Sequence, residues 1–504
     1  MKRIAITLSI LAAATSLYAQ EYITYEQFGA VGDGIHDDMD AIVAAHEAAN
    51  AKGLPVRAGE GRTYYIGGAA KTAVIRTDTD FGRARFIIDD RDVENKRTNV
   101  FEVKASAESF EVKDLQSLKS GARSLDVRLP GKCLLEVVNG NRRVYIRKGL
   151  NQNNGTAQRE MLLASRSGRI SRLSPVIWDY DTITALTAYP VDKEKVTVKG
   201  GIFTTIANNA PSAYTYYNRG ISVKRSNTLV EGITHYVEGE GDHGAPYNGF
   251  ISVDHCTGVT LKDMLFTARK TYVTNGSAGK PVSMGSYDLT IGNSVDVKVI
   301  GCRQTTDLDD RAYWGLMGSN FCKSIAMEGC SVSRFDAHQG VVNVTLRDCV
   351  FGHMYTRAVG SGTMRLERCE VRSGILFSLR DDYGSTWDGD VIVKDCILHP
   401  VDPKSKRVVV IGGSNDGTHD FGYPCRLPRR IVIDGLTIDD SVLQGQKDYD
   451  GPNVFDRFYY SPDATVPYTA EGVITARRVT VASGKPFTIS RNPERFAAYK
   501  TVGL

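Results

Sequence analysis

The chain has 504 residues, with 62 basic and 58 acidic side chains and a formal net charge of +4. This mild excess gives no reason to expect a nucleic-acid partner, and it permits an acidic polymer as a ligand. The 49 glycines and the scarcity of helix-like periodic stretches indicate an all-β chain with many turns.

Residues 1–19 have the features of a secretory signal peptide. Lys2 and Arg3 are followed by an apolar run over residues 4–17, and Ala19 ends a plausible cleavage site. No later stretch is apolar and long enough to span a bilayer. We therefore expect no membrane insertion, a periplasmic or extracellular location, and a mature chain of residues 20–504 that forms one domain.

A turn and a short helix are predicted near the new N-terminus. The sequence FGAVGDG at residues 28–34 suits a tight turn, and Asp37 or Asp38 can cap a helix that runs to Gly53. This stretch resembles the opening motif of the pectate-lyase-like superfamily of polysaccharide-degrading enzymes. The resemblance implies a right-handed parallel β-helix whose first coil is covered by the helix, with a cap around residues 28–53. It also implies that the acidic residues of the motif serve the turn and cap rather than catalysis.

Nine short apolar segments recur between Val198 and Leu436, each with strand-like alternation and one apolar face. Each unit is too short to bury that face alone, so neighbouring units must stack as a solenoid. Five cysteines occupy one repeating inward position: Cys302, Cys330, Cys349, Cys369 and Cys396. We interpret them as a column of small buried side chains, without disulfides or zinc.

The spacing of these cysteines predicts a groove. Successive intervals are 28, 19, 20 and 27 residues, so the coils from Cys330 to Cys369 are nearly free of insertions, whereas their neighbours carry long loops. A low floor between raised walls suits a polymer chain. Residues 130–195 lack this pattern, and we interpret them as an inserted β subdomain.

Polar side chains gather on the short coils. Aligned on the cysteines, the candidate lateral neighbours are Arg334 with His353, Asp336 with Tyr355, and Asp310 with His338 and Arg357. All are expected to point outward, where they could also be solvated residues in ordinary ion pairs. For His235 and His243, substrate contact and loop packing are equally compatible with the sequence.

This set suits removal of a proton α to a carboxylate, the first step of β-elimination from a uronate polymer. Arg334 or Arg357 would neutralise the carboxylate, and His338 or His353 would be the base. Tyr355 would be the acid, or base and acid combined, and Asp336 would orient a His or Arg. Four further residues are candidates for substrate binding: Asp310, Arg311, Tyr313 and Trp314.

Two other functions stay open. A glycoside hydrolase could use a carboxyl pair drawn from Asp309, Asp310 and Asp336. The third alternative is a glycan-binding protein without catalysis. Resemblance to polygalacturonases extends to Asp309-Asp310 and Gly352-His353 but lacks their Asn-Thr-Asp and Arg-Ile-Lys motifs. We expect an anionic polysaccharide as partner, no organic cofactor and no identifiable metal ligands, with calcium binding left open.

Overall fold

The computed structural model describes residues 22–504 except 114, 316 and 459–460. The expected signal peptide falls on residues outside this description. Among the described residues, no helix combines the length and the apolar character needed to cross a membrane.

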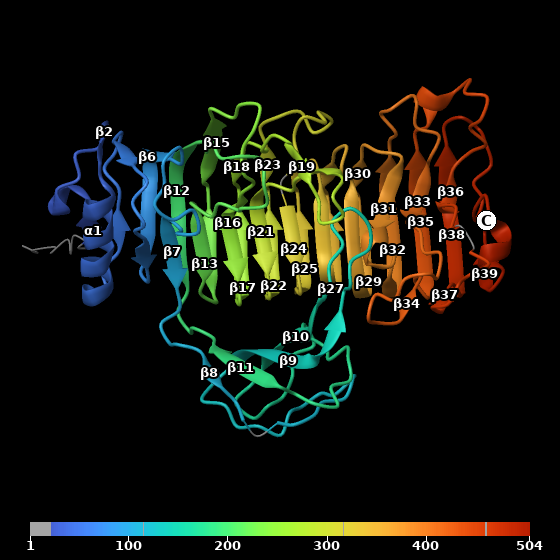
Figure 1. Ribbon diagram of the computed structural model, residues 1–504, viewed down its shortest axis with the longest axis horizontal. Coiled ribbons are helices and arrows are strands. Elements are labelled where there is room, and N and C mark those ends of the chain that lie inside the picture. Colours follow the sequence, from blue (N-terminus) through green and yellow to red (C-terminus); the bar gives the residue numbers. More distant parts are fainter. Residues whose placement is uncertain (1–21, 114, 316, 459–460) are drawn as a thin grey trace, which may run out of the picture.

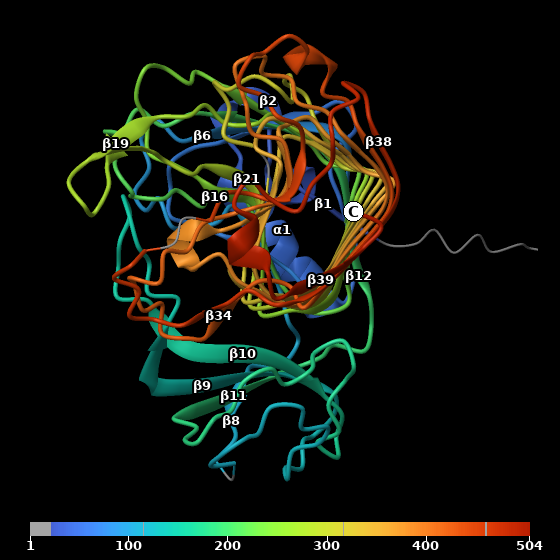
Figure 2. The same cartoon turned by 90° about the vertical axis from the view of Figure 1, so that its right-hand side faces the viewer.

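The described chain forms the expected all-β parallel β-helix, seen from the side in Figure 1 and along its axis in Figure 2. One wall of the solenoid is a continuous run of parallel strands: β6 (Thr79–Asp89), β12 (Val196–Ile206), β14 (Thr228–Glu231), β17 (Thr257–Lys262), β22 (Val295–Ile300), β25 (Lys323–Glu328), β27 (Phe335–Arg347), β29 (Thr356–Glu367), β32 (Trp387–Leu398), β35 (Arg430–Ile438) and β38 (Gly472–Val481).

A second wall, here called the front sheet, carries the candidate site. Its strands pair in parallel in this order: β5 (Ala73–Ile75), β7 (Phe101–Lys104), β13 (Ile221–Lys224), β16 (Asn248–Asp254), β21 (Tyr287–Gly292), β24 (Met317–Asn320), the first half of β27, the first half of β29, β31 (Ile375–Leu379), β33 (Val409–Gly412) and β36 (Asn453–Phe455). Alternation along each strand sends apolar side chains into the core and the others outward.

The predicted cap is confirmed as α1 (Met39–Lys52), which buries Ile42, Ala45 and Ala49 in the core at the N-terminal end (Figure 1). Asp38 precedes the helix, but its carboxylate accepts hydrogen bonds from the amides of Val31 and Gly32 rather than from the first turn of the helix. The acidic residue therefore fixes the turn against the helix.

The cysteines are buried and free, as the repeat predicts. Cys302, Cys330, Cys349, Cys369 and Cys396 are at most 2% exposed, and all nine cysteines of the chain are unpaired. Burial raises the pKa of Cys322 to about 11, so its thiol is protonated at neutral pH.

Thiol titration tests this arrangement. Within minutes, the folded protein is expected to consume less than one equivalent of a thiol reagent, because the cysteines are buried and the reaction requires an accessible thiolate. In guanidinium chloride all nine thiols should react. A native protein that consumes two or more equivalents at once would contradict the buried column.

Residues 110–190 form a separate four-stranded sheet outside the coils, visible below the solenoid in Figures 1 and 2. It comprises β8 (Phe110–Glu111), β9 (Cys133–Val144), β10 (Thr156–Ala164) and β11 (Ala185–Pro190) in the order β10-β9-β11-β8. The sheet begins before residue 130 because Glu111 pairs with Thr187. A fully buried ion pair between Lys323 and Glu160, at 2.5 Å, ties it to the solenoid.

The first coils also contain β1 (Ile23–Thr24), β2 (Asp33–Asp37), β3 (Val56–Arg57) and β4 (Thr63–Ile66), and the last coil ends with β39 (Tyr499–Val502). Two further strand pairs lie beside the walls, and short strands form the third corner of the coils. The pairs are β19 (Val273–Asn275) with β20 (Pro281–Ser283) and β34 (Cys425–Arg426) with β37 (Tyr468–Thr469). The corner strands are β15 (Thr234–Glu238), β18 (Leu265–Phe266), β23 (Arg303–Gln304), β26 (Ser331–Val332), β28 (Val350–Phe351) and β30 (Glu370–Val371). The loops between these strands and the front sheet form the rim of the site.

Candidate functional site

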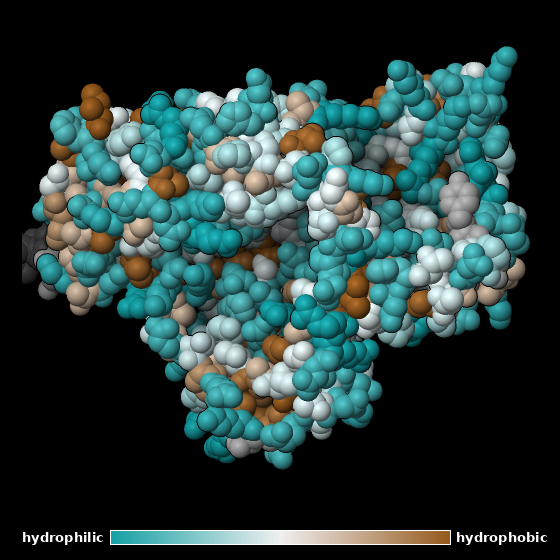
Figure 3. All heavy atoms as spheres, viewed as in Figure 1, coloured by the Kyte–Doolittle hydropathy of each residue, from teal (hydrophilic) through white to brown (hydrophobic). Residues whose placement is uncertain are grey.

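A cavity of about 550 Å³ opens on the front sheet over β27 and β29. Figure 3 shows this face hollowed where the solenoid meets the inserted sheet. The segment after β9 crosses over the coils and brings Arg147, Lys148 and Asn151 to the wall. The other aromatic, charged and titratable residues of the lining include Tyr214, Tyr216, Tyr287, Trp314, Arg334, His338, Arg357, Arg380, Asp381, Asp382 and Asp416.

Strand alternation places three charged or titratable residues at the floor. Phe335 and Ala337 point into the core, so Arg334, Asp336 and His338 point the other way. They face outward as expected, but the alternative that they are solvated surface residues is wrong for two of them. The side chains of Arg334 and Asp336 are fully buried, because the loops of the rim cover them.

Asp336 holds this floor together. Its carboxylate accepts two hydrogen bonds of 2.9 Å from Nη1 of Arg380, pairs with Arg334, and lies 2.7 Å from Nε2 of His338. A buried carboxylate requires such partners, because desolvation strongly disfavours an unpaired charge. The short contact makes Nε2 of His338 the donor, which leaves Nδ1 with the lone pair.

His338 is neutral in this environment. Burial lowers its pKa well below the usual value, and the positive charges of Arg380 and Arg334 lower it further. Even so, 24% of its side chain remains exposed, which is enough for contact with a ligand in the cavity. The hydroxyl of Tyr287 lies 3.3 Å from Nε2 of the same ring. A neutral, oriented imidazole beside a phenol can take up and deliver protons.

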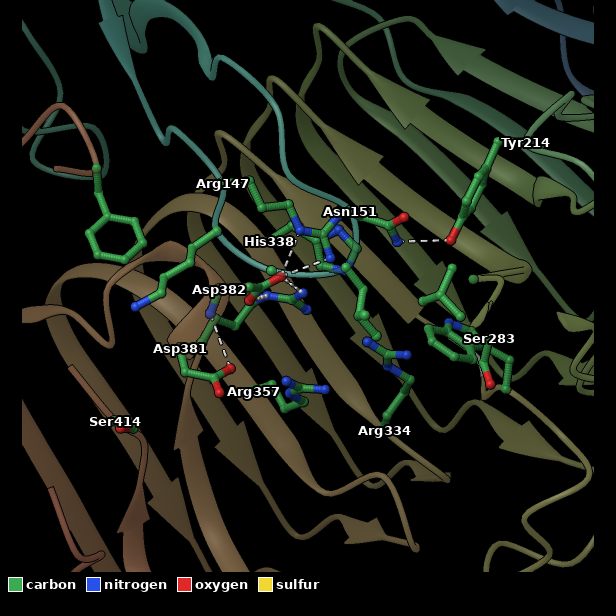
Figure 4. Close-up of a pocket in the computed structure, with 18 of the residues that line it drawn as sticks. Arg147, Asn151, Tyr214, Ser283, Arg334, His338, Arg357, Asp381, Asp382 and Ser414 are labelled. Atoms are coloured by element: carbon green, nitrogen blue, oxygen red, sulfur yellow. Dashed lines mark hydrogen bonds and ion pairs between the residues drawn. The ribbon is translucent and has the colours of Figure 1, made fainter. Parts of the chain in front are cut away.

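A second ion-pair network forms the wall nearest the inserted sheet. Arg380 donates to both carboxylate oxygens of Asp382, and Arg147 donates to one of them at 2.8 Å. Burial alone would raise the pKa of Asp382, but these two guanidinium groups outweigh it and hold the pKa below its usual range. Asp382 is therefore a fixed anion that positions Arg147 and Arg380. Figure 4 shows this network beside His338.

One arginine of the cavity has no acidic partner among the described residues, and the buried Arg334 lies beside it. Arg357 has no carboxylate within 4.0 Å among the described residues, and its guanidinium lies 5.8 Å from the centre of the Tyr355 ring. Burial lowers the pKa of Arg334 to about 9, and the neighbouring Arg357 and Arg380 contribute to this shift. The Arg334 guanidinium lies 5.0 Å from the Trp314 ring centre and 5.8 Å from that of Tyr287. Figure 4 shows Arg334 and Arg357 side by side on the floor.

Aromatic side chains line the other side of the cavity. The rings of Tyr214 and Tyr216 are stacked with centres 6.1 Å apart, and the Tyr214 hydroxyl accepts a hydrogen bond of 2.9 Å from Asn151. Trp314 adds a third ring beside them on the lining. Ring faces of this kind next to hydrogen-bonding groups can stack on sugar rings. The cavity thus combines a cationic floor with an aromatic wall.

No protein-family model matches the chain, and no curated protein matches it. Solved structures do. The tailspike of Pseudomonas phage phi297 aligns with a TM-score of 0.56 and 13% identity over 95% of this chain and 83% of that one. The tailspike of Acinetobacter baumannii bacteriophage AP22, solved with a capsular saccharide, aligns with a TM-score of 0.50 and 9% identity over 95% of this chain and 79% of that one. The likeness is one of fold.

The register predicted for two coils is wrong beyond the cysteines. Asp336 lies beside Arg357, not beside Tyr355, and His338 lies two residues further along β27. The reason is a turn over residues 352–355, in which the amide of Tyr355 donates to the carbonyl of Gly352. This turn adds two residues to the second coil, and Tyr355 takes a left-handed φ of 46° to complete it.

His353 and Tyr355 consequently lie outside the cavity lining. Nδ1 of His353 lies 2.9 Å from the carbonyl of Leu308, and Tyr355 packs against the hydrophobic core. Of the four candidates for substrate binding, Trp314 alone lines the cavity. Asp310 accepts from the amide of Ala312, and Arg311 pairs with Asp402 at 2.9 Å.

Three further candidates, Tyr313, His235 and His243, do not line the cavity. Tyr313 bridges to Lys270 on the rim. His235 is buried, with its ring stacked on Phe250 at 3.8 Å and hydrogen-bonded to Thr205, so it packs between strands of the coils rather than in a loop. His243 contacts the carbonyl of Ala210. Among the described residues, no group of three or more His, Cys, Asp and Glu side chains is arranged to hold a metal ion.

The carboxyl groups suggested for hydrolysis are divided among different partners. Asp309 faces Arg372 at 3.7 Å and Asp336 is enclosed by two arginines, while Asp310 completes a turn. Within the cavity, Asp382 pairs with arginines and Asp416 with Lys148, while the Asp381 carboxylate accepts a hydrogen bond from the amide of Asp382. Hydrolysis needs one carboxylic acid and one carboxylate facing each other across the bond to be cut. These contacts therefore favour cation-assisted chemistry.

Several residues of the cavity escaped the sequence analysis. Arg380 and Asp382 follow β31, whose Ser378 pairs with Arg357. Extending the coil alignment past Cys369 would have reached them. Tyr287 stands at the start of β21, and Arg147 and Tyr214 lie in insertions. No repeat or motif in the sequence points to those three.

Proposed function

We propose that the protein is a polysaccharide lyase that cleaves a uronate-containing polymer by β-elimination. The observation that carries this proposal is a neutral His338, held by Asp336, next to the unpaired guanidinium of Arg357. A base and a carboxylate-binding cation are the two groups that removal of a proton α to a carboxylate requires. The AP22 tailspike, solved in complex with a capsular saccharide, lends support, since a protein of similar fold binds a saccharide.

Each residue has a role in the proposed reaction. Arg357 binds the uronate carboxylate and, with the neighbouring charge of the buried Arg334, stabilises the charge that develops on it. Nδ1 of His338 takes the proton from C5, the electron pair forms the C4–C5 double bond, and the C4–O bond breaks. The Tyr287 hydroxyl donates its proton to the leaving oxygen. This replaces Tyr355, whose side chain lies against the core.

The contact between Tyr287 and His338 closes the proton balance. After the elimination, His338 carries a proton on both ring nitrogens, and Tyr287 is a phenolate 3.3 Å from Nε2. Transfer of the Nε2 proton to that phenolate restores both neutral groups, and solvent exchange restores the tautomer. Asp336 and Arg380 act as positioning residues: Asp336 contacts His338 and Arg334, and Arg380 holds Asp336.

The proposal is tested with a panel of uronate polysaccharides. Formation of unsaturated ends is followed by ultraviolet absorbance, together with reducing sugar. Both signals should rise in parallel. Reducing sugar without absorbance would indicate a hydrolase, and the absence of both signals on a broad panel would overturn an enzymatic function.

Arg357 offers a sharper test. Arg357→Ala should lower kcat/KM by about 10- to 100-fold, the loss expected for a charge-assisted hydrogen bond of about 1.5–3 kcal/mol. Arg357→Lys should retain part of the lost activity, because lysine keeps the positive charge but lacks the two parallel N–H donors of the guanidinium group. Arg372→Ala is the matched control, since Arg372 pairs with Glu370 and Asp309 outside the cavity. Equal losses in both alanine variants would contradict a role for Arg357 in binding.

The pH dependence of kcat/KM follows from the lowered pKa values of His338 and Arg334. Because the pKa of His338 is lowered, the base stays unprotonated as pH falls through about 6.5, the ordinary value for histidine, and kcat/KM declines only below it. On the alkaline side, kcat/KM should fall as the pH passes about 9, where Arg334 loses its charge. An acid limb centred above pH 6.5 would contradict the assignment of His338 as the base.

A further inference from the structure

The cavity continues into a second hollow of about 430 Å³ along the front sheet towards the N-terminal coils. The two hollows share three residues, Tyr216, Tyr287 and His338. The proposed base and acid therefore lie at the junction of the two. A polymer bound along the front sheet would place one sugar in the cavity and its neighbour in the second hollow.

The two hollows differ in charge. The cavity is lined by five cationic side chains, those of Arg147, Lys148, Arg334, Arg357 and Arg380, and by three carboxylates, those of Asp381, Asp382 and Asp416. The second hollow has one cation, Lys224, and one carboxylate, Asp254. Lys224 already pairs with Glu102 at 2.7 Å, and Asp254 pairs with His255 at 2.7 Å. Within the described residues of its lining, the second hollow offers no unpaired cation to a carboxylate.

Amide and hydroxyl groups form the floor of the second hollow. Its lining includes Asn248, Ser252, Thr290, Asn293 and Asn320, which come from β16, β21, β24 and the turn after β21. The side-chain oxygens of Asn293 and Asn320 are covered by neighbouring atoms and have no hydrogen-bond partner among the described residues. Amide and hydroxyl side chains like those of this floor can bond to the hydroxyl or acetamido groups of a sugar.

Two glycines keep this floor low. A Cβ atom on Gly318 would lie 2.9 Å from the Tyr287 ring, and one on Gly292 would lie 2.9 Å from the Asp254 carboxylate. These positions pair directly with outward-facing Thr290 and Asp254 on the neighbouring strands. The glycines therefore leave room for a ring between Tyr287 and the amide side chains.

We propose that the second hollow binds an uncharged sugar adjoining the uronate. This inference rests on the proposed lyase function and names its substrate class: a polymer in which uronate alternates with an uncharged sugar. A homopolymer of uronate would place a second carboxylate beside Asp254, without a free cation to compensate it. Such like-charge contact is strongly unfavourable when water is excluded.

The test compares pairs of polymers that contain the same uronate. One such pair is polyglucuronate, a homopolymer, and unsulfated chondroitin, in which glucuronate alternates with N-acetylgalactosamine. Within each pair, kcat/KM for unsaturated ends should be at least about tenfold higher on the alternating polymer. Equal or faster cleavage of a homopolymer would overturn this inference and leave the lyase function standing. If no polymer yields unsaturated ends, the lyase function fails and this inference with it.

Substitution at Asn320 gives a second readout. Asn320→Lys should raise kcat/KM on the homopolymer by about three- to tenfold and lower it on the alternating polymer, because it supplies the missing cation and removes an amide. Asn320→Asp should lower both. Asn141→Lys adds the same charge on the exposed surface of β9 and should change neither. If Asn320→Lys and Asn141→Lys behave alike on both polymers, the second hollow does not contact the substrate.

Discussion

Replacing His338 with alanine is expected to lower kcat by about 10²- to 10⁴-fold, the range that a positioned general base contributes. The structural reason is that this ring combines a lone pair with a fixed orientation: Nε2 is held 2.7 Å from Asp336, and burial keeps the ring neutral. The measurement is the rate of formation of unsaturated ends at saturating substrate. Circular dichroism of the variant should match that of the parent protein, because 24% of the side chain is already exposed.

His353→Ala is the matched control for this substitution. His353 was an equal candidate for the base in the sequence, but its Nδ1 contacts the carbonyl of Leu308 outside the cavity. Its removal should leave kcat within about threefold of the parent and cost about 1 kcal/mol of stability at most, as for an ordinary hydrogen bond. A large loss in His353→Ala with little change in His338→Ala would contradict the geometry of the site.

The second large effect is on stability. Asp336→Leu is expected to lower the free energy of unfolding by about 3–5 kcal/mol, the usual cost of removing one partner from a buried ion pair. It would leave Arg334, which is fully buried, and Arg380, which is 6% exposed, without the carboxylate between them. The shift is measured as a lower midpoint of guanidinium unfolding.

An exposed ion pair provides the comparison. Asp348 pairs with Arg368 at 2.7 Å, and both side chains are more than 40% exposed. Asp348→Leu should therefore change the free energy of unfolding by less than about 1 kcal/mol. Similar midpoints for Asp336→Leu and Asp348→Leu would show that the carboxylate at the floor does not hold the cationic groups together.

Much of the fold could be predicted because its physical cause is local and repeated. Each coil must present apolar side chains to the same core, so Cys330, Cys349 and Cys369 recur at matching positions in the sequence and in the structure. The cap is equally local, since a turn and an amphipathic segment stand next to each other. The sequence pattern thus led to the correct sheet faces and to the part of the solenoid where the cavity lies.

The site was predicted only in part, because the strand register beyond the cysteines and the packing of the insertions do not follow the repeat. The alignment held from Cys330 to Val332, which pairs with Phe351, but was lost in the turn at residues 352–355, which adds two residues to one coil. As a result, Arg357 rather than Tyr355 lies beside Asp336. Arg147 reaches the cavity from the loop after β9, and such a long-range contact depends on how the inserted sheet packs on the coils.

The burial of Asp336 could not be predicted either. Along β27 the residue stands at an outward position, which in an uncovered solenoid would be solvated. The rim loops cover it, and Arg380 comes from the next coil to pair with it. This coverage changes an ordinary surface ion pair into a desolvated network, and the desolvation in turn keeps His338 neutral.

Mass spectrometry of the products made in ¹⁸O-labelled water tests the central claim most directly. β-Elimination breaks the C4–O bond without consuming water, so the fragments bearing the new double bond should be lighter by one water than hydrolysis fragments and should carry no ¹⁸O from the cleavage. The account predicts this result for the parent protein and its near disappearance in His338→Ala. Saturated fragments that contain ¹⁸O at the cleaved bond would contradict it.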